Sequence, residues 1–387
     1  MTLKQRALLT TFLQSISTVL IARGIFFYTE KFHHFSKIEN LLLALVYGLS
    51  YAGAAIISHR FAERFGERRS LLITLILQIP LMIMFMTGNL SMLIIATIFS
   101  AALYGMTWPV VESYIVSGDT PKIAVKSIGW FNISWSTSNP IALLSAGFLI
   151  DTNHWALFAA ASVLTLAAAS LVTTFPRRPE HLSEDHPERP SEEIISSYES
   201  LLIASRWLMF CSYSLMWILA ALLPLIFSRL NVPVTYASPL SAVIDIMRFA
   251  IFVTFPFWTW WHGRKAPLFL VMAGLPLGFF LAMFGTNVPV IVIGEAVFGV
   301  SAATCYYASL YYAMVIKNAA VEAGGAHEGV IGMGFAVGPM LAVAGLWCGT
   351  AWNSEMLGIT AGTLPLIFLC TLKSISNLRK RSPGTGN

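Results

Sequence analysis

Apolar stretches of about 20 residues recur along almost the whole of this 387-residue chain. A helix needs about 20 residues to cross the hydrocarbon core of a bilayer, so each stretch is long enough for one crossing. Charged residues make up only 11% of the chain, against about 25% in a soluble domain, so much of the surface must face lipid. The sequence therefore predicts an all-α polytopic membrane protein. Its twelve candidate spans are 7–29, 39–58, 70–87, 91–116, 126–150, 154–175, 203–228, 236–261, 266–286, 289–316, 328–350 and 354–376.

Lysine and arginine residues fall mainly on one side of this predicted topology. With twelve spans both termini lie on the same side, and 19 of the 24 basic residues belong to that side. Lys31, Lys37 and Arg229 belong to the other side, and Arg23 and Arg248 lie within spans. The positive-inside rule then predicts cytoplasmic termini in a bacterial inner membrane, with an uncleaved first helix. The net charge of +5 follows from this topology and gives no reason to expect nucleic-acid binding.

A charged, proline-containing segment, residues 176–197, interrupts the apolar pattern near the middle of the chain. It cannot bury an apolar face, so we expect a flexible cytoplasmic linker. It divides the chain into an N-terminal six-helix bundle, residues 1–175, and a C-terminal six-helix bundle with a short cytoplasmic tail, residues 198–387.

Turn and kink signals suggest that the two bundles are repeats. Gly66 follows the second span and Gly263 follows the eighth, 197 positions later. Pro140, after an asparagine, lies in the fifth span, and Pro339, after a glycine, lies 199 positions later in the eleventh. Nearly equal spacing of corresponding signals indicates a duplicated six-helix unit.

The loop after the second span carries an acid, an arginine, a glycine and a basic pair in the order Glu63, Arg64, Gly66, Arg68 and Arg69. This order resembles the signature loop of the major facilitator superfamily, a Gly-x-x-x-Asp-Arg-x-Gly-Arg-Arg pattern between helices two and three. Here histidine replaces the first glycine, glutamate replaces aspartate, and a second glutamate interrupts the basic run. Glycine permits the turn, and the acid can pair with a helix N-terminus or a base. Such a loop can lock one conformation of a two-state carrier; alternatively, it only sets topology.

This resemblance implies two six-helix bundles related by a pseudo-two-fold axis along the membrane normal. It also implies alternating access around a central site without an ATP site, and the chain has no phosphate-binding Gly-x4-Gly-Lys-Ser/Thr motif. In the eleventh span Gly325, Gly334, Gly338 and Pro339 partly resemble the glycine-rich motif of facilitator-family proton antiporters. Small residues allow close helix approach and proline can kink a helix, so we expect close packing of a moving helix there.

Ionisable residues within the bilayer are costly and are functional candidates by default. Asp245 and Arg248, three positions apart in the eighth span, share a helix face. They form either a proton-coupling or substrate-binding pair, or a structural ion pair. Glu112 in the fourth span is a candidate proton carrier or a gate contact for a nearby lysine. Glu295 lies near the outer end of the tenth span, where solvation is also feasible.

Arg23, in the outer part of the first span, is a candidate for holding an anionic group of a substrate. It could instead neutralise Glu295 or extend to the outer surface. Glu328, at the predicted start of the eleventh span, has a structural interpretation as a favourable charge at a helix N-terminus.

Aromatic and amide side chains enrich the fifth and tenth spans. They could stack on and hydrogen-bond a sugar-like or aromatic substrate, or could serve packing and interfacial anchoring. The candidates are Trp130, Asn132, Trp135 and Asn139 in the fifth span and Tyr307 and Tyr311 in the tenth.

Together these features favour a proton-coupled secondary transporter that works by alternating access on a small polar or anionic organic solute. Proton-antiport efflux of amphiphilic drugs or metabolites is the alternative, and a non-transporting sensor or lipid-handling protein is a third interpretation. No nucleophile–base pair or metal-ligand spacing stands out in the sequence, so we expect no enzyme activity, metal or cofactor. We expect a monomer in the lipid bilayer that binds a small-molecule substrate and protons.

Overall fold

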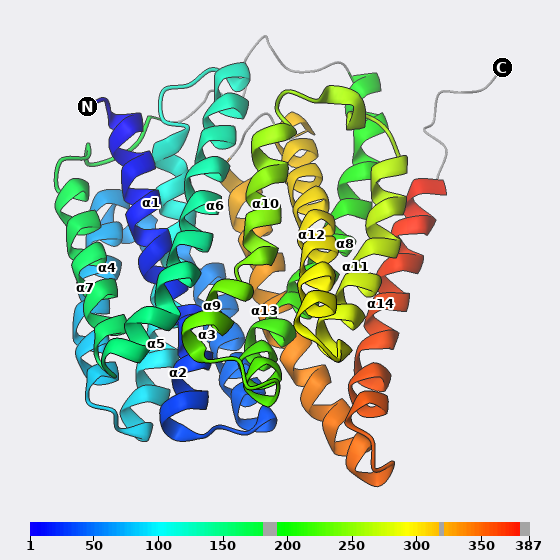
Figure 1. Ribbon diagram of the computed structural model, residues 1–387. Helices are drawn as coiled ribbons and strands as arrows, with labels where there is room; N and C mark the ends of the chain where they lie inside the picture. The colour runs from blue at the N-terminus through cyan, green and yellow to red at the C-terminus, as the bar shows by residue number, and fades with distance from the viewer. Residues whose placement is uncertain (181–191, 317–320, 380–387) are drawn as a thin grey trace.

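The computed structural model describes residues 1–180, 192–316 and 321–379. Within these ranges the chain forms fourteen α-helices, one short 3-10 helix (η1) and no strand (Figure 1). The helices are α1 (Leu3–Ala22), α2 (Gly24–His33), α3 (Lys37–Phe65), α4 (Glu67–Met86), α5 (Leu90–Ile115), α6 (Pro121–Thr152), α7 (Ala156–Val172), α8 (Glu192–Arg229), α9 (Val234–Leu240), α10 (Val243–Thr254), η1 (Thr259–Trp261), α11 (Ala266–Phe284), α12 (Val288–Ile316), α13 (Val321–Ala351) and α14 (Glu355–Arg379).

These helices match the twelve predicted spans in order. Ten helical stretches in the described residues are long and apolar enough to cross a membrane, and α6, with 32 residues, and the shorter apolar α7, with 17, complete the series. The all-α, twelve-span fold predicted from the sequence is confirmed. Of the predicted linker, residues 181–191 lie outside the described part, and α8 already begins at Glu192.

Two of the twelve spans are broken helices. The first consists of α1 and α2, which meet at Arg23, where the backbone leaves the regular helical conformation (φ −115°, ψ −38°). The eighth consists of α9 and α10, which are separated by Ser241 and Ala242. Breaks within a membrane free backbone polar groups, and they are tolerated where protein or a cavity satisfies those groups.

The helices form two halves, α1–α7 and α8–α14, that lie side by side with their axes roughly parallel (Figure 1). The chain starts at one end of the bundle, and α14 finishes at the same end; we call this the terminal end and the other the distal end (Figure 1). Contacts between the halves are extensive along α3 and α13 and where α6 meets α9 and α10.

Glycines allow the halves to approach closely at two places. A Cβ added at Gly48 of α3 would lie 2.3 Å from the Phe335 backbone of α13. A Cβ added at Gly147 of α6 would lie 2.3 Å from the carbonyl oxygen of Val234, where α9 begins. Both distances are far below van der Waals contact, so any larger residue would push the halves apart.

The two signals of internal repetition recur as matching structural features. Gly66 (φ 81°) and Gly263 (φ 67°) both have a positive φ in corresponding turns, a conformation that glycine adopts without strain. Pro140 lies inside α6 and Pro339 inside α13, the fifth spans of their halves. The pairing supports two related six-helix bundles.

Candidate functional site

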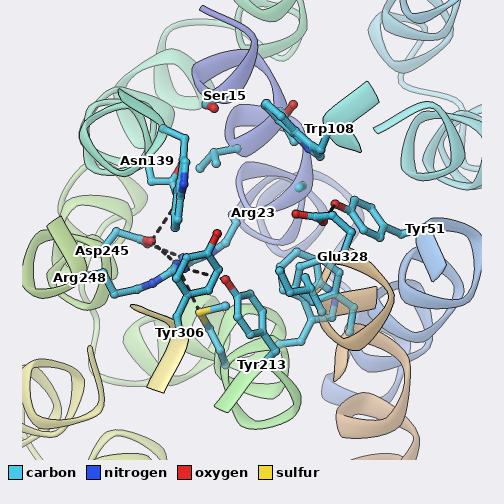
Figure 2. Close-up of a pocket in the computed structure, with 18 of the residues that line it drawn as sticks. Ser15, Arg23, Tyr51, Trp108, Asn139, Tyr213, Asp245, Arg248, Tyr306 and Glu328 are labelled. Carbon is cyan, nitrogen blue, oxygen red and sulfur yellow. Dashed lines mark hydrogen bonds and ion pairs between the residues drawn. The ribbon is translucent and has the colours of Figure 1, made fainter. Parts of the chain in front are cut away.

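A cavity of about 130 Å³ lies between the two halves and draws its lining from both (Figure 2). The lining residues are Ser15, Thr18, Val19, Ala22, Arg23, Tyr47, Tyr51, Trp108, Phe131, Trp135, Asn139, Tyr213, Met216, Trp217, Asp245, Arg248, Tyr306, Glu328, Ile331 and Phe335. Charged groups and aromatic rings dominate this list, which is unusual for the interior of a chain this apolar.

The two broken spans meet at this cavity. Arg23, at the junction of α1 and α2, donates from Nη1 to Oδ2 of Asp245 at 2.6 Å. Its Nη2 also reaches the carbonyl oxygen of Ser241, in the break before α10, at 3.5 Å. The helix breaks therefore place a basic group of one half against an acid and a free carbonyl of the other, as discontinuous helices do at transporter binding sites.

Asp245 is the centre of a polar cluster (Figure 2). Besides the bond from Arg23, its Oδ1 accepts from Nη1 of Arg248 at 3.0 Å and from Nδ2 of Asn139 at 3.3 Å. The two arginines and Asp245 are 6%, 4% and 1% exposed. The bonds from Arg23 and Asn139 cross between the halves, so this carboxylate joins them.

Arg248 is held on several sides. Its Nη2 donates to the Tyr213 hydroxyl at 2.9 Å, and its guanidinium lies 4.9 Å from the ring centre of Trp135 and 5.6 Å from that of Tyr213. Cation–π contacts of this kind strengthen when they are desolvated. The surroundings orient Arg248 toward Asp245 and the cavity.

A second acidic position lies across the cavity from this cluster (Figure 2). Glu328 of α13 is 6% exposed and accepts from the hydroxyl of Tyr51, on the other half, at 2.5 Å. Glu112 of α5 lies close enough to interact electrostatically with Glu328, and no described residue gives it a hydrogen bond or an ion pair. The cavity thus has a guanidinium end and a carboxylate end.

Glu295 of α12 is fully buried near the arginine cluster and interacts electrostatically with Arg23 and Asp245. Neither of its carboxyl oxygens has a hydrogen-bond partner among the described residues. An ionised carboxylate without a donor is costly in a low-dielectric interior. Among the described residues, Asp245 is the acid that forms an ion pair with Arg23.

Aromatic rings connect the two ends of the cavity. Trp217 stacks on Phe335 with ring centres 3.9 Å apart, and Tyr213 contacts Phe335 at 5.7 Å. Tyr47 contacts Trp217 at 5.2 Å, and Tyr306 contacts Tyr213 at 6.2 Å. We call these five residues the aromatic wall; they come from α3, α8, α12 and α13.

Several residues predicted for the substrate site lie outside the cavity lining. Trp130 is 52% exposed, and Asn132 is buried and accepts from the Trp135 indole at 2.9 Å. Tyr307 and Tyr311 pack against Trp261 at 5.6 and 4.9 Å. Asn132 thus helps to orient Trp135, which lines the cavity.

The loop that resembles the facilitator signature lies at the terminal end, away from the cavity. Glu63 pairs with His59 on the helix surface at 3.0 Å, and Arg64 and Arg69 are exposed. Arg68 instead donates from Nη1 to the carbonyl oxygen of Phe175 at 3.0 Å. In this conformation the loop holds the chain segment after α7.

The predicted close packing on α13 is present. A Cβ at Gly338 would lie 1.9 Å from the carbonyl oxygen of Ser214, and one at Gly334 would lie 2.8 Å from Cβ of Tyr213. These glycines bring α13 against α8, next to the aromatic wall.

The sequence interpretation missed much of the aromatic wall, and it also missed Tyr51 of the cavity lining. Tyr47 and Tyr51 on α3, and Tyr213 and Trp217 on α8, are each four positions apart and therefore share a helix face. That spacing was a usable signal, but it looks the same for a packing face and for a cavity face.

Within the described residues, no three His, Cys, Asp or Glu side chains cluster as a metal ion would require. The site offers hydrogen bonds, charge and aromatic surface, and these suit the binding of an organic solute.

A helical membrane bundle of two halves, with a charged cavity between them, defines a membrane transport fold. The family model described as Major Facilitator Superfamily matches residues 7–343, and the chain belongs to this superfamily.

Solved structures share this fold over nearly the whole chain. The nucleoside transporter NupG matches with a TM-score of 0.68 and 14% identity, over 98% of this chain and 100% of that one. The human organic anion transporter MFSD10 matches with 0.63 and 12%, over 96% and 98%. A bacterial homologue of the human lysosomal transporter Spinster, in an inward-facing and unoccupied conformation, matches with 0.67 and 15%, over 99% and 98%. Identities this low show the fold alone. No curated protein sequence matches this one.

Proposed function

We propose that this protein is a proton-coupled secondary transporter that carries a small polar or anionic organic solute by alternating access. The observation that carries the proposal is the cluster of Arg23, Asp245 and Arg248, which is buried, lines the cavity and bridges the two halves. A solute that binds there contacts both halves, and its binding energy can therefore bias their relative positions.

Contacts between the halves at the distal end support the proposal that this conformation is closed there. Thr235 of α9 donates to Asp151 of α6 at 2.5 Å, and Ser238 donates to the carbonyl oxygen of Leu143 at 2.6 Å. Lys37 of α3 also pairs with Glu355 of α14. The excess of basic residues at the terminal end supports the proposal that this end is cytoplasmic, in a bacterial inner membrane.

We assign proton binding to the carboxylate end. Asp245 contacts two guanidinium groups and remains the counter-ion of both. Glu328 is buried and Glu112 is partly buried, and they lie close together with no cationic partner among the described residues. Acids within a membrane form proton relays in transporters. Proton binding at one end and solute binding at the other can then act on the same cavity.

Efflux of an amphiphilic compound in exchange for protons is the second candidate, because the aromatic wall suits an apolar body. The two candidates differ in the direction of proton movement relative to the solute.

The test is flux in liposomes that contain a trapped pH dye, with pooled candidate solutes added to the outside. We expect a solute-triggered pH change with the wild type. Glu328→Gln should abolish proton movement and retain solute exchange between two filled compartments. Glu199→Gln, at an exposed acid on α8, is the matched control. Proton movement that survives in both Glu112→Gln and Glu328→Gln would refute the assignment, and absence of flux for every pool would refute transport of these solute classes.

A further inference from the structure

The arginine cluster has one positive charge more than its direct contacts balance. Two guanidinium groups, Arg23 and Arg248, share the single carboxylate of Asp245. A guanidinium carries five N–H donors, yet Nε of Arg248 has no partner among the described residues, and the second contact of Arg23 is long. The cluster is therefore short of one anion.

This deficit lies where solvent compensates it poorly. Both arginines are more than nine-tenths buried, and a buried charge without a counter-ion is strongly destabilising. Glu295 lies close enough to interact electrostatically with Arg23, but neither of its oxygens accepts a hydrogen bond from a described residue, so it leaves the guanidinium donors open. A bound anion would complete the cluster.

Tyr213 places the anion position next to the aromatic wall. Its hydroxyl accepts from Arg248 at 2.9 Å, and its ring contacts Phe335 and Tyr306. One side chain thus belongs to both the charged and the aromatic surfaces. A ligand that uses both must carry its ring within a bond or two of its anionic group.

The far end of the cavity limits the ligand to one negative charge. Glu328 lines the cavity opposite the arginines, and Glu112 lies beside it. A second anionic group at the distant edge of the ligand would face these acids and be repelled.

From this geometry we infer that the solute is an aromatic monoanion, such as an aryl carboxylate. Its anionic group binds Arg23 and Arg248 in exchange for part of the Asp245 contact, and its ring lies against the aromatic wall. The inference names the substrate class of the transport function proposed above and rests on it.

The test measures equilibrium binding to the purified full chain in nanodiscs of uncharged lipid, which needs no flux. The probes are benzoate, phenylacetate and naphthoate. Benzamide removes the charge, cyclohexanecarboxylate removes the aromatic ring, and terephthalate adds a second charge at the far edge. We expect the aromatic monoanions to bind about 10- to 100-fold more tightly than benzamide, because charge-assisted hydrogen bonds are lost. Terephthalate should bind at least as weakly as benzamide, and cyclohexanecarboxylate should bind several-fold more weakly than benzoate.

Variants locate the binding. Arg248→Gln should weaken benzoate binding about 10- to 100-fold, and Arg178→Gln, which changes an exposed arginine in the segment after α7, should leave it unchanged. If Arg248→Gln does not fold, Tyr213→Phe removes only one hydroxyl and should weaken binding several-fold.

Each outcome decides the proposal separately from transport. Equal binding of benzoate and benzamide, no effect of either cavity variant, or no binding of any aromatic monoanion up to millimolar concentration overturns the substrate class, even if another solute is transported. Tight benzoate binding with no flux of any solute would support the substrate class and overturn the transport function.

Discussion

Replacing Asp245 by asparagine should destabilise the protein far more than replacing either arginine that contacts it. Asp245→Asn leaves two buried guanidinium groups without a counter-ion. Arg23→Gln leaves Asp245 paired with Arg248 and still bonded by Asn139. The asymmetry follows from the ion pairs, in which two arginines share one aspartate.

The magnitudes follow from the burial of these groups. Breaking a buried ion pair so that a charge stays uncompensated costs about 3–5 kcal/mol. Losing one hydrogen bond to a charged group that keeps another partner costs about 1.5–3 kcal/mol. The two variants should therefore differ by about 2 kcal/mol, or roughly 30-fold in the equilibrium constant. The double variant with Arg23→Gln and Asp245→Asn should fall between the two single variants, because it retains one uncompensated arginine instead of two.

The assay is unfolding of the purified protein in one detergent, with and without benzoate. Asp245→Asn should unfold first, and benzoate should stabilise it more than it stabilises the wild type, because the added carboxylate occupies the vacated counter-ion position. Arg23→Gln that proves as damaging as Asp245→Asn would refute the charge count. A double variant less stable than both single variants would refute the direct contact between Arg23 and Asp245.

Two further predictions concern the packing around the site. Gly147→Ala should force α6 and α9 apart, since its Cβ would lie 2.3 Å from a backbone oxygen. It should therefore increase labelling of a Thr18→Cys reporter by an impermeant maleimide added from the distal side. The control is Gly129→Ala, on the same helix, whose Cβ would have nothing within 4 Å; equal labelling of both would contradict the distal closure. Arg68→Ala should lower the free energy of unfolding by about 1–2 kcal/mol, because it loses the hydrogen bond to the Phe175 carbonyl. Arg69→Ala, at an exposed position, should change the free energy of unfolding by less than about 0.5 kcal/mol. Similar values for the two variants in denaturation experiments would contradict this prediction.

The fold could be predicted from the sequence because lipid imposes a simple rule. Every backbone polar group must be satisfied within the span, so length and apolarity identify the helices. The breaks at Arg23 and before Val243 were not predicted, because a single turn lost from a helix leaves the hydropathy of the span unchanged.

The site could be predicted only where its members lie on one helix. Asp245 and Arg248 are three positions apart, so their pairing follows from helix geometry. Arg23 is 222 positions from Asp245, and its partner depends on how the halves pack. The same holds for Glu112, for which the sequence suggested a nearby lysine and the structure shows Glu328 as its electrostatic neighbour.

Glu328 shows how a small error in a helix boundary changes an interpretation. The sequence placed it at the start of a span, where an acid is stabilised by the helix N-terminus. The helix begins earlier, at Val321, so Glu328 lies inside it and reaches the cavity. Polar residues precede the apolar run there, and hydropathy locates the lipid-facing run, not the helix itself.

At the distal surface, as in the cavity, two basic residues share one acid. The two groups differ in depth, and this difference bears on how solute binding is coupled to distal opening. Glu355 pairs with Lys37 of the N-terminal half and with Arg229 of its own half at 3.1 Å. If the halves separate at the distal end, Glu355 can stay paired with Arg229, and Asp245 with Arg248, within the C-terminal half. Lys37 and Arg23 of the N-terminal half then lose their acidic partners. The Lys37 side chain, 11% exposed in the closed state, then meets water at the distal surface at little cost. Arg23 lies deeper, at the cavity, and needs another anion. Under alternating access the bound solute supplies that anion, so solute binding and distal opening favour each other through a single buried guanidinium.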